Sequence, residues 1–181
     1  MNIFYLNEDP QVCAEMHLDK HVVKMIIEYA QLLSTAHRVL DGTEYYDKTS
    51  NGRRIKRWKM DDLMMENTLY KASHINHPSA KWVRESVENY QFLLKLWQLL
   101  SFEYTYRYGK IHMTFDKLKD VLTSVPNNIP KTKFFEPPQA MPDDVKDKNT
   151  IKAYHKYYKV HKSGFAKWTN RPVPQFMMEC A

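Results

Sequence analysis

Residues 10–42 read PQVCAEMHLDKHVVKMIIEYAQLLSTAHRVLDG, and this stretch decides the fold because it has the pattern of one long helix. At about 100° of rotation per residue, its polar side chains fall on one narrow edge of that helix. The edge consists of His17, His21, Lys24, Glu28, Gln31 and Thr35. The remaining apolar arc covers roughly 220°, which is wider than a surface helix needs. The pattern therefore predicts a mostly buried helix whose polar edge faces a cleft.

Glu28, His21 and Lys24 are candidates for an active site on this polar edge. A carboxylate, an ammonium group and imidazoles would lie within about three helical turns, against apolar walls that shift pKa values. The same residues also fit a plain amphipathic helix, with Lys24 and Glu28 in solvent and His21 hydrogen-bonded beside them. The helical pattern alone leaves both interpretations open.

Length and composition favour one folded domain over residues 1–181. The mean hydropathy is −0.64, and no apolar run approaches the roughly 18 residues of a membrane span, so we expect no membrane segment. The start MNIFYL lacks the features of a secretory signal, and two cysteines are too few for a disulfide framework. We therefore expect a cytoplasmic protein.

The net charge of +6 favours a polyanionic partner. From Lys152 to Arg171 the chain carries six Lys or Arg and no Asp or Glu, with five aromatic residues among them. Such a segment suits phosphate contacts and base or sugar stacking. It also suits an ordinary helix that packs its aromatic rings inward and extends its lysines into solvent. Both interpretations remain open.

The pattern along the whole chain predicts an all-α protein, a compact bundle of about four to five helices with no sheet. A short extended N-terminal segment precedes the first helix, and a long proline-rich loop spans Asn127–Asp144. The expected helices are Pro10–Gly42, Asp61–Tyr70, Pro78–Tyr106, Thr114–Ser124 and Thr150–Trp168. The segment Thr43–Lys59 is expected to be an exposed basic loop, either solvated or in contact with an acidic partner.

Several reaction classes lack their usual motifs in this chain. There is no Gly-rich phosphate loop, no Gly-x-Ser-x-Gly and no Cys-x-x-Cys, which disfavours nucleotide hydrolases, serine hydrolases and zinc ribbons. His17 and His21 have the i, i+4 spacing of zinc ligands, and His74 and His77 could add to them. The spacing dictates no third ligand, so we expect no metal and no other cofactor.

Scattered pieces over most of the chain carry a resemblance to a known family. They are the start MNIFYL, Asp19-Lys20-His21 with Glu28 seven residues after His21, His77-Pro78, Glu103, Arg107-Tyr108-Gly109 and Arg171-Pro172. Together they resemble the pyrimidine-dimer DNA glycosylases of the phage endonuclease V type. The resemblance implies an all-α fold that grips bent DNA, and it is typical of a phage-encoded protein.

The resemblance also implies roles for individual residues. The N-terminal amine, here that of Met1, would attack the sugar C1′ of a damaged nucleotide and form a Schiff base. The catalytic carboxylate falls on Glu28 and the helix histidine on His21. An α-amino group has an ordinary pKa near ~8, against ~10.4 for lysine, so part of it is uncharged and nucleophilic at neutral pH.

The family's arginine-rich catalytic helix has no equivalent here, since Ile27 and Gln31 stand where guanidinium groups would be expected. Phosphate contacts must therefore come from other residues. The predicted DNA-binding residues are Lys24, Arg38, His77, Arg107, Lys110, Lys156, Tyr157, Lys159 and Arg171. Arg107 and Lys110 also fit a simpler role, because cations at a helix C-terminus complement its dipole.

The sequence thus predicts a DNA-repair or base-processing enzyme, a DNA N-glycosylase with possible abasic-site lyase activity on damaged pyrimidines. The alternatives are a phage enzyme that modifies a DNA base, and a non-catalytic basic DNA-binding protein. The expected partner is double-stranded DNA. We expect a monomer that needs no obligate protein partner and does not bind a membrane.

Overall fold

The computed structural model describes residues 1–178 and shows a mixed fold. It contains eight α-helices and a two-stranded antiparallel sheet within these residues, and it is 53% helical. The predicted all-α bundle of four to five helices is therefore wrong. The elements are α1 Pro10–Met16, α2 Asp19–Asp41, β1 Thr43–Lys48, β2 Arg54–Lys59, α3 Leu63–Thr68, α4 Pro78–Glu85, α5 Val87–Tyr108, α6 Met113–Leu118, α7 Thr150–His161 and α8 Gln175–Met178.

The predicted helix over residues 10–42 is divided into α1 and α2. The chain is extended at His17 and Leu18, with ψ of 131° and 156°. The His17 Nδ1 donates to the carbonyl of Cys13, 2.7 Å away, so the side chain closes the end of α1. A helical pattern in the sequence does not reveal this break, because apolar residues continue at helical spacing on both sides of it.

The second long helix is divided in the same way, at Ser86, whose φ is −151°. The Ser86 hydroxyl donates to the carbonyl of Lys133 at 2.9 Å and accepts the backbone N–H of Glu88. It therefore caps α5 and also holds the proline-rich loop. Gly109 ends α5 in the left-handed conformation with φ of 67°, which glycine adopts without strain.

The predicted basic loop over residues 43–59 is a β-hairpin. Thr43 pairs with Lys59 and Lys48 with Arg54 in an antiparallel register. The turn is closed by the Thr49 backbone N–H, which donates to the Arg53 carbonyl at 2.9 Å. Gly52 adopts φ of 78°, a conformation that glycine adopts without strain.

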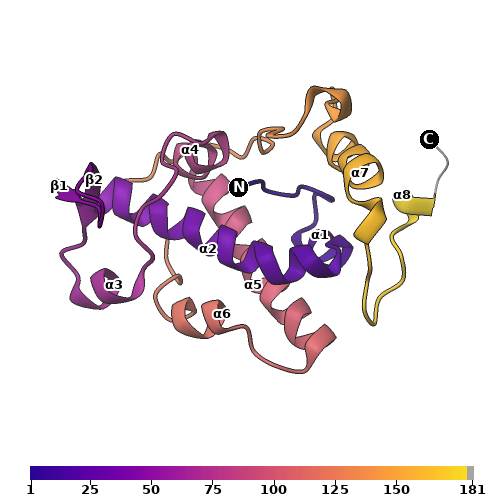
Figure 1. Cartoon of the computed structure of the whole chain (residues 1–181), viewed down its shortest axis with the longest axis horizontal. Helices are drawn as coiled ribbons and strands as arrows, with labels where there is room; N and C mark the ends of the chain where they lie inside the picture. The colour runs from indigo at the N-terminus through magenta and orange to yellow at the C-terminus, as the bar shows by residue number, and fades with distance from the viewer. Residues whose placement is uncertain (179–181) are drawn as a thin grey trace.

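α2 runs along the long axis through the centre of the molecule, with the hairpin at one end and α7 near the other (Figure 1). α2 packs against α5, and the Trp97 Nε1–H donates to the Ile26 carbonyl at 3.0 Å between them. A continuous apolar core surrounds this contact and includes Tyr29, Trp82 and Leu93. Among residues 1–178, no helix is both long enough and apolar enough to cross a membrane.

The N-terminal segment from Ile3 to Leu6 is extended and buried, yet it pairs with no strand. Side chains form hydrogen bonds with some of its backbone N–H and C=O groups instead. The Phe4 N–H donates to the Tyr29 hydroxyl at 3.1 Å, and the His155 Nε2 donates to the Leu6 carbonyl at 2.8 Å. These bonds fix the start of the chain on the core.

Candidate active site

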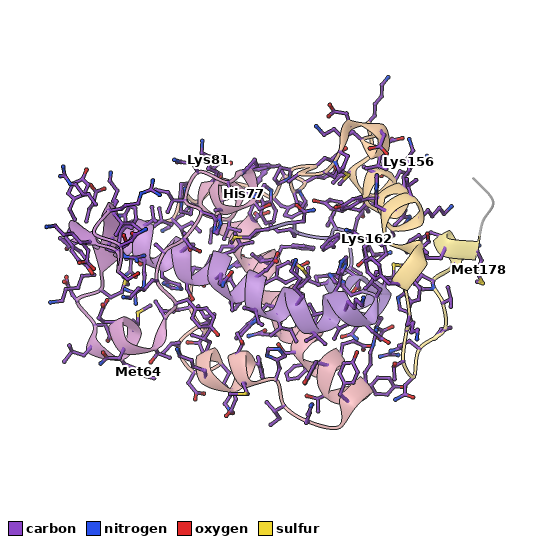
Figure 2. The ribbon with its side chains drawn as sticks, viewed as in Figure 1. Met64, His77, Lys81, Lys156, Lys162 and Met178 are labelled. Atoms are coloured by element: carbon purple, nitrogen blue, oxygen red, sulfur yellow. The ribbon has the colours of Figure 1, made fainter. Side chains whose placement is uncertain are left out.

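A small pocket lies where the start of the chain meets α2 and the end of α7. Its volume is about 120 Å³. Its lining residues, which define the N-terminal pocket, are Met1, Asn2, Phe4, His21, Lys24, Met25, Glu28, Tyr157 and Lys162. Figure 2 shows Lys162 between α7 and the N-terminal half of α2. The structure therefore brings together five residues that the sequence analysis singled out from three separate parts of the chain.

Glu28 and Lys24 form an ion pair within this pocket. Their carboxylate and ammonium groups are 3.1 Å apart, one helical turn from each other on α2. The Glu28 side chain is 16% exposed and the Lys24 side chain 68% exposed. The carboxylate is thus partly removed from water, whereas the ammonium group remains accessible to a ligand.

The N-terminal residue, which lines the same pocket as Glu28, is fixed to the first turn of α4. The Met1 carbonyl accepts a hydrogen bond from the Ser79 hydroxyl at 3.0 Å, in the first turn of α4. His77 caps that helix through its Nδ1, which accepts the Ser79 N–H. Burial lowers the pKa of His77, and the positive charge of the N-terminal amine lowers it further, while Glu28 opposes this shift. His77 therefore lies within electrostatic range of both the amine and Glu28.

His21 forms part of the pocket wall as a neutral ring. Its Nδ1 shares a hydrogen bond of 2.8 Å with the Tyr158 hydroxyl, and its ring stacks on Phe4 at 4.1 Å between centroids. Burial lowers the pKa of His21 to about 2, with further contributions from His17, Lys162 and Lys24. At neutral pH the ring carries no charge, so it positions neighbouring groups and does not act as an imidazolium acid.

Tyr157 and Lys162 complete the pocket from the other side. The Tyr157 ring is nearly parallel to Phe4, at 9° and 6.1 Å, and the Lys162 ammonium group lies 4.7 Å from the Tyr157 centroid. Sequence analysis missed Lys162, as well as Asn2, Phe4 and Met25. α7 ends at His161, so Lys162 leaves the helical path. A helical pattern could not predict that this lysine turns back toward the pocket.

Arg38, a predicted DNA-binding residue, is buried and used inside the protein. Its guanidinium group donates to Glu66 Oε2 at 2.6 Å and to the carbonyls of Tyr70, Trp58, Glu66 and Leu69. These bonds use all its N–H donors and connect α2 with the segment around α3. Arg38 therefore stabilises the fold and has no donor left for a phosphate group.

Arg107 and Arg171 are also tied to other parts of the protein. The buried Arg107 donates to Glu103 at 2.7 Å and to Asp19 at 2.8 Å. Arg171 lies 2.8 Å from the second Glu103 oxygen and 3.3 Å from Glu15. Together Arg107, Glu103, Asp19, Arg171 and Glu15 form what we call the inner ion network, which joins α1, α2 and α5 to the C-terminal segment.

The remaining predicted DNA-binding residues lie outside the pocket. Lys156 is exposed on α7 (Figure 2), and Lys159 is half-buried on the same helix. Lys110 is exposed just after Gly109, at the end of α5. In the described part of the chain, no three His, Cys, Asp or Glu side chains are grouped to hold a metal ion.

Comparisons with known proteins found no relative of this chain. No family model, no curated protein and no solved structure matches the chain.

Proposed function

We propose that this protein is a DNA glycosylase with abasic-site lyase activity, in which the α-amine of Met1 is the nucleophile and Glu28 the catalytic carboxylate. One observation carries the proposal. The N-terminal residue and a partly buried carboxylate line the same pocket, together with the exposed Lys24 and the half-buried Lys162. The family resemblance of the sequence supports the same assignment.

In the first step the uncharged Met1 amine attacks C1′ of the target nucleotide. The bond between C1′ and the base nitrogen breaks, and the base leaves with the electron pair and takes up a proton. The Glu28 carboxylate stabilises the positive charge that develops on the sugar, and it accepts a proton from the attacking amine. Glu28 then passes that proton to O4′ as the C1′–O4′ bond breaks, so the sugar ring opens to give an iminium ion between Met1 and C1′.

In the second step a proton is removed from C2′, which the iminium ion acidifies. The electron pair forms a C2′–C3′ double bond, and the 3′ phosphate leaves as the C3′–O bond breaks. Water then hydrolyses the iminium ion and releases the free amine. Glu28 is placed to shuttle these protons because its carboxylate lies in the same pocket as Met1.

The other pocket residues fit substrate binding. Lys24 and Lys162 can contact phosphates on either side of the target sugar, and Phe4 and Tyr157 offer aromatic surface. The pocket volume of about 120 Å³ is small, which suits a sugar ring better than a whole base pair. The duplex must therefore open or bend, which damaged pairs do at lower cost.

Borohydride trapping on a duplex with one abasic site tests the proposal. Borohydride reduces the iminium ion to a stable amine, so the wild type should form a covalent adduct and nick the strand. Glu28→Gln should reduce both rates by about 10²-fold or more. The matched control Glu85→Gln removes an exposed carboxylate on α4, which lies outside the pocket, and should retain both rates.

Two results would overturn the proposal. One is a wild type that neither forms an adduct nor nicks abasic or dimer-containing DNA. The other is unchanged activity in Glu28→Gln. A mass change in nucleosides without strand breaks would instead indicate base modification, and DNA binding without any chemistry would indicate a non-catalytic binding protein.

A further inference from the structure

We propose that the β1–β2 hairpin, residues 43–59, is a second DNA-binding element that contacts the phosphate backbone of a duplex outside the N-terminal pocket. Six Lys or Arg and two Asp or Glu in this segment give it a net charge of +4, whereas the whole chain carries +6. The hairpin is thus one of two strongly basic segments, and the other is the segment from Lys152 to Arg171. The proposal goes beyond the proposed function, since it does not require the pocket to be catalytic.

The hairpin has little core of its own, so its side chains are available to a partner. All six residues of β1 are exposed, and within β2 only Trp58 is buried. Tyr45 and Tyr46 are 42% and 54% exposed. A two-stranded hairpin is marginal in isolation. This hairpin is anchored at its base, where the Trp58 carbonyl accepts a hydrogen bond from Arg38 at 3.0 Å.

The backbone at the base fixes the direction in which the hairpin leaves α2. A side chain on Gly42 would approach the Arg38 carbonyl to 2.5 Å and the Lys59 carbonyl to 3.0 Å. Only glycine therefore allows the strand to leave the helix so close to β2. The hairpin projects at one end of the molecule in Figure 1, and Gly42 lies about 21 Å along α2 from Glu28.

Cations and a tyrosine occur on both faces of the ribbon. The register places Tyr46 opposite Lys56 and Lys48 opposite Arg54 on one face, and Tyr45 opposite Arg57 on the other. A two-stranded β-ribbon fits the major groove of B-DNA, where phosphate-bearing strands border it on both sides. Charge on both faces is therefore the arrangement that such a ribbon needs.

Two of the cations are already engaged by other side chains of the hairpin, whereas the two cations that flank the turn have no ion-pair partner in the part of the chain that the structure describes. Lys56 pairs with Glu44 at 3.0 Å, and the Arg54 guanidinium group lies 3.6 Å from the Tyr46 ring centroid. Lys48 and Arg53 take part in no ion pair among residues 1–178. Both flank the turn.

A shallow hollow of about 470 Å³ lies at the turn. It is lined by Thr49, Ser50, Asn51, Arg53, Arg54 and Ile55. Two guanidinium-bearing residues beside short polar side chains provide donors for phosphate oxygens. The tip of the hairpin therefore has the chemistry of a phosphate contact.

The test measures binding of the full chain to an undamaged 30-base-pair duplex by fluorescence anisotropy over a range of salt concentrations. The double variant Lys48→Gln with Arg53→Gln should weaken binding by on the order of tenfold at 0.1 M salt and reduce the salt slope by about 1.8. The matched control Lys95→Gln with Lys117→Gln removes the same charge from exposed positions on α5 and α6. It should leave both quantities near the wild-type values.

Wild-type affinity and slope in the hairpin variant would overturn the proposal, and so would an equal loss in the control, which would indicate a general effect of net charge. Circular dichroism and the melting temperature verify that both variants are folded. Adduct formation under saturating DNA depends on the pocket alone. A weakened hairpin variant together with an inactive wild type would therefore support this proposal and reject the proposed function.

Discussion

Two groups of charged residues in this protein have similar chemistry and different surroundings. In the inner ion network, the Arg107 side chain is 0% exposed and the Glu103 side chain 2% exposed. In the N-terminal pocket, the Lys24 side chain is 68% exposed and that of Glu28 is 16% exposed. Both groups contain an i, i+4 pair of opposite charge on a long helix.

The two groups differ in how many hydrogen-bond donors of the cation remain free to bind a ligand. Arg107 donates to two carboxylates and to the carbonyls of His17 and Glu15. Lys24 has a single ion-pair partner among the described residues, and that partner borders a pocket. A charged residue whose donors are used inside the protein stabilises the fold, whereas one with spare donors at a pocket can bind a ligand.

Breaking the inner ion network should give the largest loss of stability at neutral pH. Arg107→Met leaves the Glu103 and Asp19 carboxylates without their buried partner, and we expect the free energy of unfolding to fall by about 3–5 kcal/mol. The melting temperature should fall by roughly 10 °C. Arg107→Lys should not restore it, because a single ammonium group cannot replace the forked donors. An unchanged melting temperature would contradict a structural role for Arg107.

The second expected effect is that stability depends on pH, because the histidines His17 and His21 are buried. Burial lowers the pKa of His17 from 6.5 to about 4, and that of His21 to about 2. Below pH 6.5 the unfolded chain binds protons that the folded chain does not, so stability is lost as the pH falls toward 4. The expected slope is about 1.4 kcal/mol per pH unit for each histidine.

Urea denaturation at several pH values measures this slope. His21→Phe should reduce it by the contribution of one proton. His74→Asn is the control, because His74 is exposed in the loop before α4. A stability that stays constant between pH 6.5 and 4, or an equal change of slope in the control, would show that His17 and His21 are not held neutral by burial.

Removing a pocket cation should reduce activity and leave the free energy of unfolding nearly unchanged. Lys24→Gln and Lys162→Gln should each reduce adduct formation by about tenfold, through one lost charge-assisted contact to phosphate. The free energy of unfolding should change by no more than about 0.5 kcal/mol, since neither ammonium group is buried. A large loss of stability without a loss of activity would show that the pocket lysines have a structural role, as Arg107 has, and would contradict their role in binding.

The smallest effect is expected for an exposed ion pair. Lys56 and Glu44 lie 3.0 Å apart across the hairpin, and both side chains are 40% or more exposed. Glu44→Gln should change the free energy of unfolding by at most about 0.5 kcal/mol, because water and salt screen such pairs. A change comparable to that of Arg107→Met would show that exposure does not separate the two kinds of ion pair.

The sequence predicts those parts of the fold that depend on local pattern. Most of the apolar arc of α2 is buried as expected, although Val23 and Ile27 are 40% and 38% exposed. Pro78 lies in the first turn of α4, also as expected. The breaks at His17 and Ser86 depend on distant partners, such as the carbonyl of Lys133 for the Ser86 hydroxyl. The hairpin lacks an apolar face on β1, so no alternation of apolar residues marks its strands.

The candidate site was predictable to a similar degree. Helical spacing placed His21, Lys24 and Glu28 on one edge, and the structure places them in one pocket with Met1. Charge alone suggested Arg38 and Arg107 as DNA contacts, but it does not reveal that folding uses their donors. Lys162 was missed because it follows the last residue of α7, where helical spacing no longer applies.

Mass mapping of the borohydride-trapped protein is the most direct test of the central claim. After digestion of the adduct formed on an abasic duplex, the DNA-derived mass should lie on the N-terminal peptide, on the α-amine of Met1. A mass found instead on a peptide containing Lys24, Lys162 or another lysine would contradict the assignment of the chain's own amine as the nucleophile.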